Sequence, residues 1–160
     1  MKMKRQKKLD KKRRKQSKTN YKKRLNLLKG NYPRLVVRKS NKYITIQIIK
    51  SKNAQDKVLY MVNSKELLKH GWPEDKSGSL KNLSASYLAG FLLGKKAKTL
   101  KQELILDSGL IPSTKGSRVY AAVKGVSDAG LKINFSKGIA PSQEKIENKE
   151  FFNKIKGGIK

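Results

Sequence analysis

The 160-residue chain contains no cysteine, only one histidine and only 11 acidic residues. Without cysteine it has no disulfides, no thiolate metal ligands and no thiol nucleophile. The few acids stand against 40 Lys and Arg residues, which gives a formal net charge of +29. Such a field attracts polyanions and serves no purpose in an enzyme for small neutral molecules. The composition therefore indicates a polyanion-binding protein, and we expect no cofactor and no small-molecule substrate.

Long apolar runs are also missing. The most apolar stretch, residues 87–94, is far shorter than the ~20 residues of a membrane-spanning helix. The first residues lack the apolar region of a secretory signal. We therefore expect a soluble, intracellular protein without a membrane partner.

The positive charge is concentrated at the N-terminus. Residues 1–30 hold 15 Lys and Arg and one acid, a net +14, whereas residues 31–160 hold 25 and 10, a net +15. The run that includes Lys11, Lys12, Arg13 and Arg14 has almost no apolar surface to bury. We expect residues 1–30 to be a basic extension, disordered when free and ordered against an anionic surface. A solubilising tail or a nuclear-import signal is the alternative.

Three β-rich segments follow. Residues 34–38 and 43–49 predict a hairpin around a polar turn at 39–42, and residues 57–62 predict a third strand after a polar loop at 51–56. Alternation assigns the apolar side chains to one face, toward the core. This inward set is Leu35, Val37, Ile44, Ile46 and Ile48.

Helical patterns alternate with one further strand in the rest of the chain. Helices are predicted over 19–28, 64–70, 82–98 and 117–129, with Ser64 as an N-cap and Gly71 as a stop. The apolar run 103–107 predicts a strand buried on both faces. These elements predict an α/β fold: a mixed sheet, made of a three-strand antiparallel meander plus one more strand, with packed helices. We expect this domain to cover residues 31–136, followed by a peripheral segment at 137–160.

The outward face of the hairpin carries groups suited to nucleic acid. Arginines clamp phosphates, an aromatic ring stacks on bases, and an amide or hydroxyl bonds base edges. An ordinary polar sheet face is the alternative. The predicted contacts on this face and its turn are Arg34, Arg38, Ser40, Asn41, Lys42, Tyr43 and Gln47, with Thr45 beside them.

A second candidate contact is the loop before the helix at 117–129. Backbone N–H groups and a helix N-terminus suit a phosphate, and Lys115, Gly116 and Arg118 lie there. The order Lys115, Gly116, Ser117 does not fit a nucleotide-binding P-loop. A plain strand-to-helix connection is the alternative.

Catalytic groups are scarce. The single histidine, His70, is predicted near a helix end, where capping is an ordinary role. A metal-dependent nuclease needs several clustered carboxylates, but only Asp107 and Asp128 lie at suggestive positions. We therefore expect no enzymatic activity.

Ordered motifs over residues 19–146 resemble the large-subunit ribosomal protein eighteen family in its archaeal branch. The motifs are Thr19-Asn-Tyr21 with Arg24, Pro33-Arg-Leu-Val-Val-Arg-Lys-Ser-Asn-Lys-Tyr43, His70-Gly-Trp72, Ala85-Ser-Tyr-Leu-Ala-Gly90, Leu106-Asp-Ser-Gly-Leu110 and Lys115-Gly-Ser-Arg-Val-Tyr-Ala-Ala-Val-Lys-Gly125. The family usually has Asp at Asn20 and Pro-His at Asn134 and Phe135, so the resemblance weakens toward the C-terminus.

The resemblance implies a cytoplasmic, structural protein of the large ribosomal subunit. Members hold 5S rRNA against the large rRNA in the central protuberance, beside ribosomal protein five (bacterial-type numbering) and other proteins. It also implies which residues face rRNA. These are Tyr21 and Arg24 in the extension, Arg34, Arg38, Ser40, Asn41, Lys42 and Gln47 on the hairpin, and Lys115, Gly116 and Arg118 in the second loop. From the residues alone, a basic nucleoid or chromatin DNA-binding protein is the alternative.

Overall fold

The computed structural model describes residues 9–53, 55–147 and 151–159. One four-stranded sheet has the order β3-β2-β1-β4. Its strands are β1 (Arg34–Lys39), β2 (Ile44–Lys52), β3 (Gln55–Asn63) and β4 (Ile105–Asp107). β1 pairs antiparallel with β2 and parallel with β4, and β2 pairs antiparallel with β3. The predicted mixed sheet, a meander plus one strand, is confirmed.

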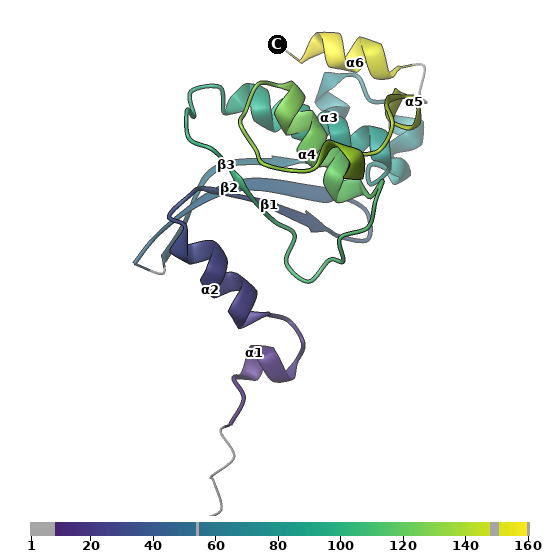
Figure 1. The fold of residues 1–160 in the computed structure, drawn as a ribbon. Helices are drawn as coiled ribbons and strands as arrows, with labels where there is room; N and C mark the ends of the chain where they lie inside the picture. Colours follow the sequence, from purple (N-terminus) through teal and green to yellow (C-terminus); the bar gives the residue numbers. More distant parts are fainter. Residues whose placement is uncertain (1–8, 54, 148–150, 160) are drawn as a thin grey trace, which may run out of the picture.

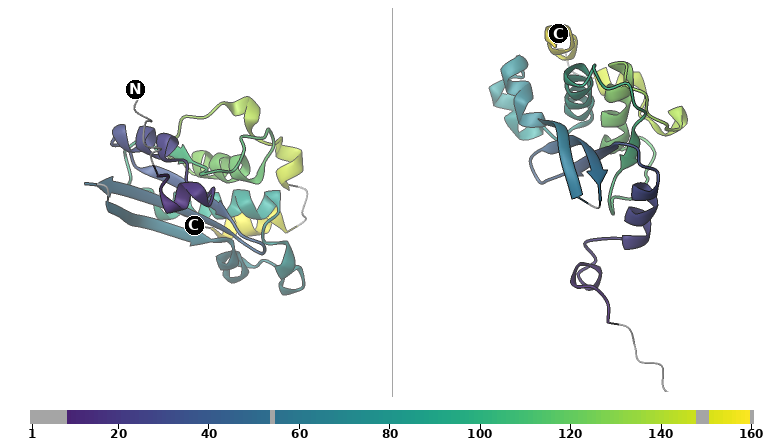
Figure 2. Two further views of the ribbon diagram at one scale, coloured as in Figure 1. Left: turned by 90° about the horizontal axis from the view of Figure 1, so that it is seen from below. Right: turned by 90° about the vertical axis from the view of Figure 1, so that its left-hand side faces the viewer.

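Helices cover one face of the sheet and leave the other open, as Figures 1 and 2 show. α3 (Leu83–Lys96) and α4 (Arg118–Asp128) form the covering layer, and both match the predicted helices. Asn82 caps α3 by accepting a 2.7 Å hydrogen bond from the Ala85 N–H. The inward strand residues Leu35, Ile46 and Ile48 are fully buried beneath these helices, as alternation predicted.

The predicted polar loop at residues 51–56 is wrong. β2 and β3 stay paired out to Lys52 and Gln55, so the hairpin is longer than its apolar part. Ser51 lies opposite Asp56, and its hydroxyl donates a 2.6 Å hydrogen bond to the Asp56 carboxylate. Polar cross-strand contacts thus continue the ladder after the apolar residues end.

The apolar run at 103–107 forms an edge strand, and the prediction of burial on both faces is wrong. Leu104 is fully buried and bridges to Ile133, but Ile105 and Leu106 of β4 are only half-buried. The end of the extension partly covers this edge, since Ile105 lies close to Gly30. The run is apolar because it meets both the core and the extension.

The segment at 64–70 forms a 3₁₀ helix, η1 (Ser64–His70), and its N-cap is Asn63. The Asn63 side chain accepts from the Lys65 N–H, and Glu66 accepts from the Asn63 N–H, which is a capping box. The predicted cap Ser64 instead accepts a hydrogen bond from Ile44 of β2. Gly71 ends the helix in the left-handed conformation, as predicted.

The C-terminal segment contributes to the core, which differs from the expected peripheral position. Beyond η2 (Glu74–Ser79), the remaining short elements are η3 (Lys137–Ile139), α5 (Gln143–Glu147) and α6 (Phe152–Gly158). Phe152 and Ile155 of α6 are fully buried, and the Phe152 ring lies 5.6 Å from the Tyr87 ring of α3. Figure 1 shows α6 lying on α3. The spacing of the apolar residues in α6 places them on one face.

The described part of the N-terminal extension lies on the side of the sheet away from α3 and α4, with one helix close to the sheet and the other farther out (Figure 1). It contains α1 (Lys12–Lys15) and α2 (Tyr21–Lys29), the latter matching the helix predicted over 19–28. The Asn20 side chain caps α2 by accepting from the Lys23 N–H at 3.0 Å. Disorder of the extension in the free protein stays a prediction. Among the described helices, none is long and apolar enough to cross a membrane.

α3 and α4 approach each other through glycines. A Cβ on Gly90 would overlap the Ala122 carbonyl of α4, and a Cβ on Gly125 would overlap the Tyr87 carbonyl of α3. Only glycine allows the two backbones to pack this closely.

We predict that Gly90→Ala lowers the free energy of unfolding by at least about 2 kcal/mol, because the overlap outweighs the ~1 kcal/mol gain in helix propensity. Urea unfolding measures the change. Gly157→Ala in α6 is the matched control, since nothing lies within 4 Å of its Cβ position. Equal stability of the two variants would contradict the account of this packing.

Candidate nucleic-acid interface

A cleft of about 440 Å³ separates the extension from the body of the protein. It lies between the N-terminal segment, the end of β1 and the loop after β4. Its basic lining residues are Arg13, Lys18, Lys23, Arg24 and Arg38. We call this the basic cleft. Asp107 is the only acid among its lining residues.

Asp107 fixes two arginines of β1. Its carboxylate accepts from Arg34 Nη1 at 2.9 Å and from Arg38 Nη2 at 3.2 Å, and it also accepts from the Gly109 N–H. Arg38 Nη1 donates to the Asp107 carbonyl at 2.8 Å. Burial alone would raise the pKa of this carboxyl, but the guanidiniums and the backbone N–H hold the pKa below its ordinary value. Asp107 is therefore ionised at neutral pH.

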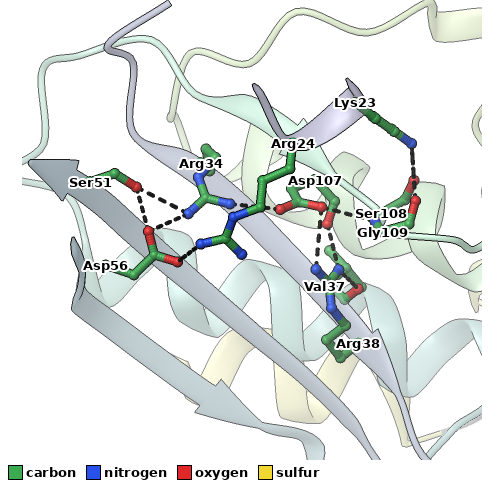
Figure 3. A network of polar contacts seen from close by, with 10 residues as sticks. All are labelled: Lys23, Arg24, Arg34, Val37, Arg38, Ser51, Asp56, Asp107, Ser108 and Gly109. Carbon is green, nitrogen blue, oxygen red and sulfur yellow. Dashed lines mark hydrogen bonds and ion pairs between the residues drawn. The ribbon is translucent and has the colours of Figure 1, made fainter. Parts of the chain in front are cut away.

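Asp56 fixes the other side of the same cluster. Its carboxylate accepts from Arg34 Nη2 at 2.8 Å and from Arg24 Nη2 at 3.1 Å, besides the Ser51 hydroxyl. Burial would raise the pKa of Asp56, but the Ser51 hydroxyl and the two guanidiniums lower it below its ordinary value. Figure 3 shows the resulting network, which we call the arginine–aspartate network: Arg24, Arg34, Arg38, Asp56 and Asp107.

The prediction that Arg34 is exposed for phosphate contact is wrong. Its side chain is 3 % exposed, and its two Nη atoms bond Asp107, Asp56 and Ser51. Alternation correctly placed Arg34 on the face opposite Leu35, but that face is covered here by its acidic partners. Arg34 therefore holds Asp107 and Asp56 in place from a buried position. Arg38, in contrast, keeps 47 % of its side chain exposed.

The β1–β2 turn presents the predicted exposed groups. Asn41 and Lys42 are exposed. Ser40 closes the turn, because its hydroxyl donates to the Tyr43 carbonyl and accepts from the Tyr43 N–H, both at 2.9 Å. The Tyr43 ring is half-buried and packs against the core, so only part of it is available for stacking.

The open sheet face adds polar and apolar groups next to the turn. Gln47 is half-buried with its amide 3.2 Å from the Met61 sulfur, and Met61 is 52 % exposed. Thr45 accepts from the Asn63 side chain at 3.1 Å. This face offers one amide and one polarizable side chain to a flat partner such as a base.

The predicted contacts of the extension lie on α1 and at the start of α2. Lys11, Lys12, Arg13 and Arg14 are exposed. Lys11 Nζ lies 4.7 Å from the centre of the Tyr21 ring, and Arg13 donates to Thr19 at 2.8 Å. These contacts leave the cationic groups at the surface.

The second basic loop lies beside the end of β1. A shallow cleft of about 300 Å³ is lined by Lys39, Gly116 and Arg118, so the two predicted contact regions are neighbours. The Gly116 N–H donates to the Ile139 carbonyl and the Ser117 N–H to the Thr114 carbonyl. These two N–H groups are therefore already bonded within the protein, and phosphate contact at this loop stays a prediction. The charged side chains Lys115 and Arg118 remain as its candidate contacts.

Sequence reasoning missed several cleft residues. Lys18 and Lys23 line the basic cleft, and Lys23 Nζ bonds the Ser108 hydroxyl and the Gly109 carbonyl. For Lys39, the sequence predicts only a place in the polar turn at 39–42. In a lysine-rich chain, the sequence does not distinguish a lysine at a site from one at the general surface. The spacing of apolar residues in α2 predicts a helix but not which residues of the body this helix contacts.

In the described ranges, no three His, Asp or Glu side chains gather as a metal site requires. Asp107 is held by two guanidiniums, and Asp128 accepts a 2.7 Å hydrogen bond from the Tyr87 hydroxyl. Arginine-bound carboxylates are poor metal ligands, which argues against the two-metal nuclease.

We predict that Asp107→Asn lowers the free energy of unfolding at neutral pH by about 3 kcal/mol, because a buried guanidinium loses a charged partner. Urea unfolding measures the change, with the exposed Asp75→Asn as control. If both variants unfold alike, the network is not a stabilising element.

The same network predicts an acid sensitivity. The pKa of Asp107 is lowered on folding, so its contribution is complete above the unfolded value of 3.8 and is lost as the pH falls through the folded value. Unfolding free energies at about pH 6 and about pH 3 should therefore differ more in the wild type than in Asp107→Asn. Parallel pH profiles would contradict this.

Comparison with known proteins gives concordant matches. A family model of ribosomal large subunit proteins 60S L5 and 50S L18 matches residues 4–103 and 97–136. Large ribosomal subunit protein uL18 of Korarchaeum cryptofilum is 50 % identical over 135 residues, which cover 84 % of this chain and 67 % of that relative. The uL18 proteins of Methanoregula boonei and Thermofilum pendens are 38 % and 44 % identical, covering 92 % and 91 % of this chain and 84 % and 72 % of the relatives.

Proposed function

The chain belongs to the family of ribosomal large subunit proteins 60S L5 and 50S L18, and we propose that it binds 5S rRNA and anchors it to the large rRNA in the central protuberance. The family predicted from the ordered motifs is confirmed. Its members are ribosomal proteins rather than enzymes, so the chain is a structural, RNA-binding protein of the large subunit of the cytoplasmic ribosome. We also propose that its partners there are 5S rRNA and neighbouring large-subunit proteins, including ribosomal protein five in the bacterial-type numbering.

The convergence of carboxylate-bound and exposed cations on one cleft carries this proposal. Arg24 and Arg38 are held in place by carboxylates, while Arg13 and Lys18 reach the same cleft from the extension. Fixed guanidiniums lose little freedom when they bind a phosphate, and mobile lysines add attraction that releases counterions. A folded RNA offers phosphates on several sides of such a cleft at once.

The open sheet face supports RNA over duplex DNA. The major groove of an A-form helix is too deep and narrow for side chains, so proteins read RNA by its shape and by unstacked bases. A flat face with Gln47, Met61 and part of Tyr43 suits an unstacked base.

A competition assay tests the proposal against the DNA-binding alternative. The protein is bound to labelled 5S rRNA at ~150 mM salt, where weak electrostatic binding fades, and challenged with unlabelled 5S rRNA or mixed-sequence duplex DNA. We expect 5S rRNA to compete far better. Equal competition by duplex DNA would contradict the proposal.

We predict that Arg38→Ala weakens 5S rRNA binding by roughly tenfold, because it removes a guanidinium held at a fixed position. Lys12→Ala in α1 should weaken binding less, since neighbouring cations replace a mobile ammonium. Quantitative filter binding of both variants gives the ranking, and urea unfolding checks that each is folded. The reverse ranking would refute the contact assigned to β1.

A further inference from the structure

α2 contacts the body through polar side chains and through the half-buried Leu27, which lines the basic cleft with Leu110 and Ile111. Within Tyr21–Lys29 no residue is buried, and Leu25 is 54 % exposed. The two tethers of α2 come from adjacent residues. Lys23 Nζ bonds Ser108 and Gly109 after β4, and Arg24 pairs with Asp56 at 3.1 Å on the β2–β3 hairpin (Figure 3). Lys23 and Arg24 thus supply the hydrogen bonds and the ion pair that join this helix to the body.

Repulsion between the positive charges of the extension and of the body opposes this docking unless a negative group lies between them. The extension carries a net +14 and the rest of the chain a net +15. At their junction, Asp56 stands between Arg24 and Arg34 and bonds both. If Asp56 lost its negative charge, the guanidiniums of Arg24 and Arg34 would have no carboxylate between them. Two positive charges that share one neighbouring group repel each other.

The Arg24–Asp56 pair differs from an ordinary exposed ion pair, which contributes little. Asp56 is held by the Ser51 hydroxyl and by Arg34, which is 3 % exposed and also bound to Asp107. The acceptor is therefore fixed before Arg24 arrives, and only the Arg24 side chain loses freedom on pairing. A preorganised acceptor makes the pair more favourable than two mobile partners.

We propose that Asp56 is a positioning residue that docks α2 against the β2–β3 hairpin in the free protein. Arg24 then enters the RNA complex already placed, and the segment expected to be disordered when free shrinks to the residues before Asn20. This inference rests on the proposed function only where RNA binding is concerned.

Hydrogen exchange in the free protein tests the docking without RNA. Asp56→Asn removes the charge, and Arg24→Gln removes the partner while leaving Arg34, Asp56 and Ser51 paired. Lys22→Gln is the matched control for Arg24→Gln, because it also removes one positive charge from α2, at an exposed side chain with no hydrogen bond or ion pair among the described residues. We expect α2 amides to exchange about fivefold faster in both test variants than in the control.

The core strands report whether the domain itself is affected. Exchange in β1 and β2 should be unchanged in Arg24→Gln, so that faster exchange in α2 reflects undocking alone. If α2 exchanges alike in all three variants, Asp56 does not dock the helix and the inference is overturned.

The affinity for RNA provides a second test. Whether Asp56→Asn raises or lowers this affinity distinguishes a positioning role from the effect of net charge alone. Asp56→Asn makes the protein more positive, which by charge alone strengthens binding to RNA. If Asp56 positions α2, Asp56→Asn should instead lose about threefold in affinity for 5S rRNA. In this variant α2 is undocked in the free protein, so part of the binding free energy is used to order it. The control Asp75→Asn makes the same charge change at an exposed residue of η2 and should bind as tightly as the wild type or more tightly.

Equal or tighter binding by Asp56→Asn than by Asp75→Asn would overturn the positioning role in RNA binding. A failure of the proposed function looks different, because wild type and variants alike would then show no preference for 5S rRNA while the exchange result stands.

Discussion

The buried ion pair between Arg34 and Asp107 is the interaction on which the arrangement of the charged groups depends. It joins residues 73 positions apart, on the parallel strands β1 and β4. Removing two charges from water is costly, and a buried pair is tolerated only when its remaining hydrogen-bonding groups find partners. Arg34 Nη2 finds them in Asp56 and Ser51, and Asp107 finds them in Arg38 and Gly109. The buried Arg34 Nε finds no partner among the described residues. The positions of Arg38 and Arg24 at the basic cleft follow from this pair, because Arg38 shares Asp107 with Arg34 and Arg24 shares Asp56 with Arg34.

Two of the few acids place arginines, whereas most of the described lysines are exposed. Asp56 and Asp107 together hold Arg24, Arg34 and Arg38. Most lysines are exposed and provide attraction without fixed geometry. The net charge of +29 therefore has two parts: a diffuse field from the lysines, and a small set of oriented guanidiniums that a folded RNA can recognise by shape.

The sheet and the main helices could be predicted because their signals are local. Alternation placed Leu35 and Ile46 in the core, and helical spacing located α3 and α4. The burial of Arg34 could not be predicted, because its partners lie on strands whose neighbours the sequence does not reveal. The core position of Phe152 depends in the same way on α3, far along the chain. Local patterns thus predicted the frame, and long-range ion pairs decided which charges face outward.

The central claim is that these oriented cations hold 5S rRNA in the large ribosomal subunit. Stepwise salt washing of purified large subunits tests it most directly, with protein and 5S rRNA followed in the released and retained fractions. Because binding is ionic and centred on 5S rRNA, the account predicts that both leave the subunit together, at the same salt concentration. Release of the protein from subunits that retain all their 5S rRNA, or loss of 5S rRNA while the protein stays bound, would contradict it.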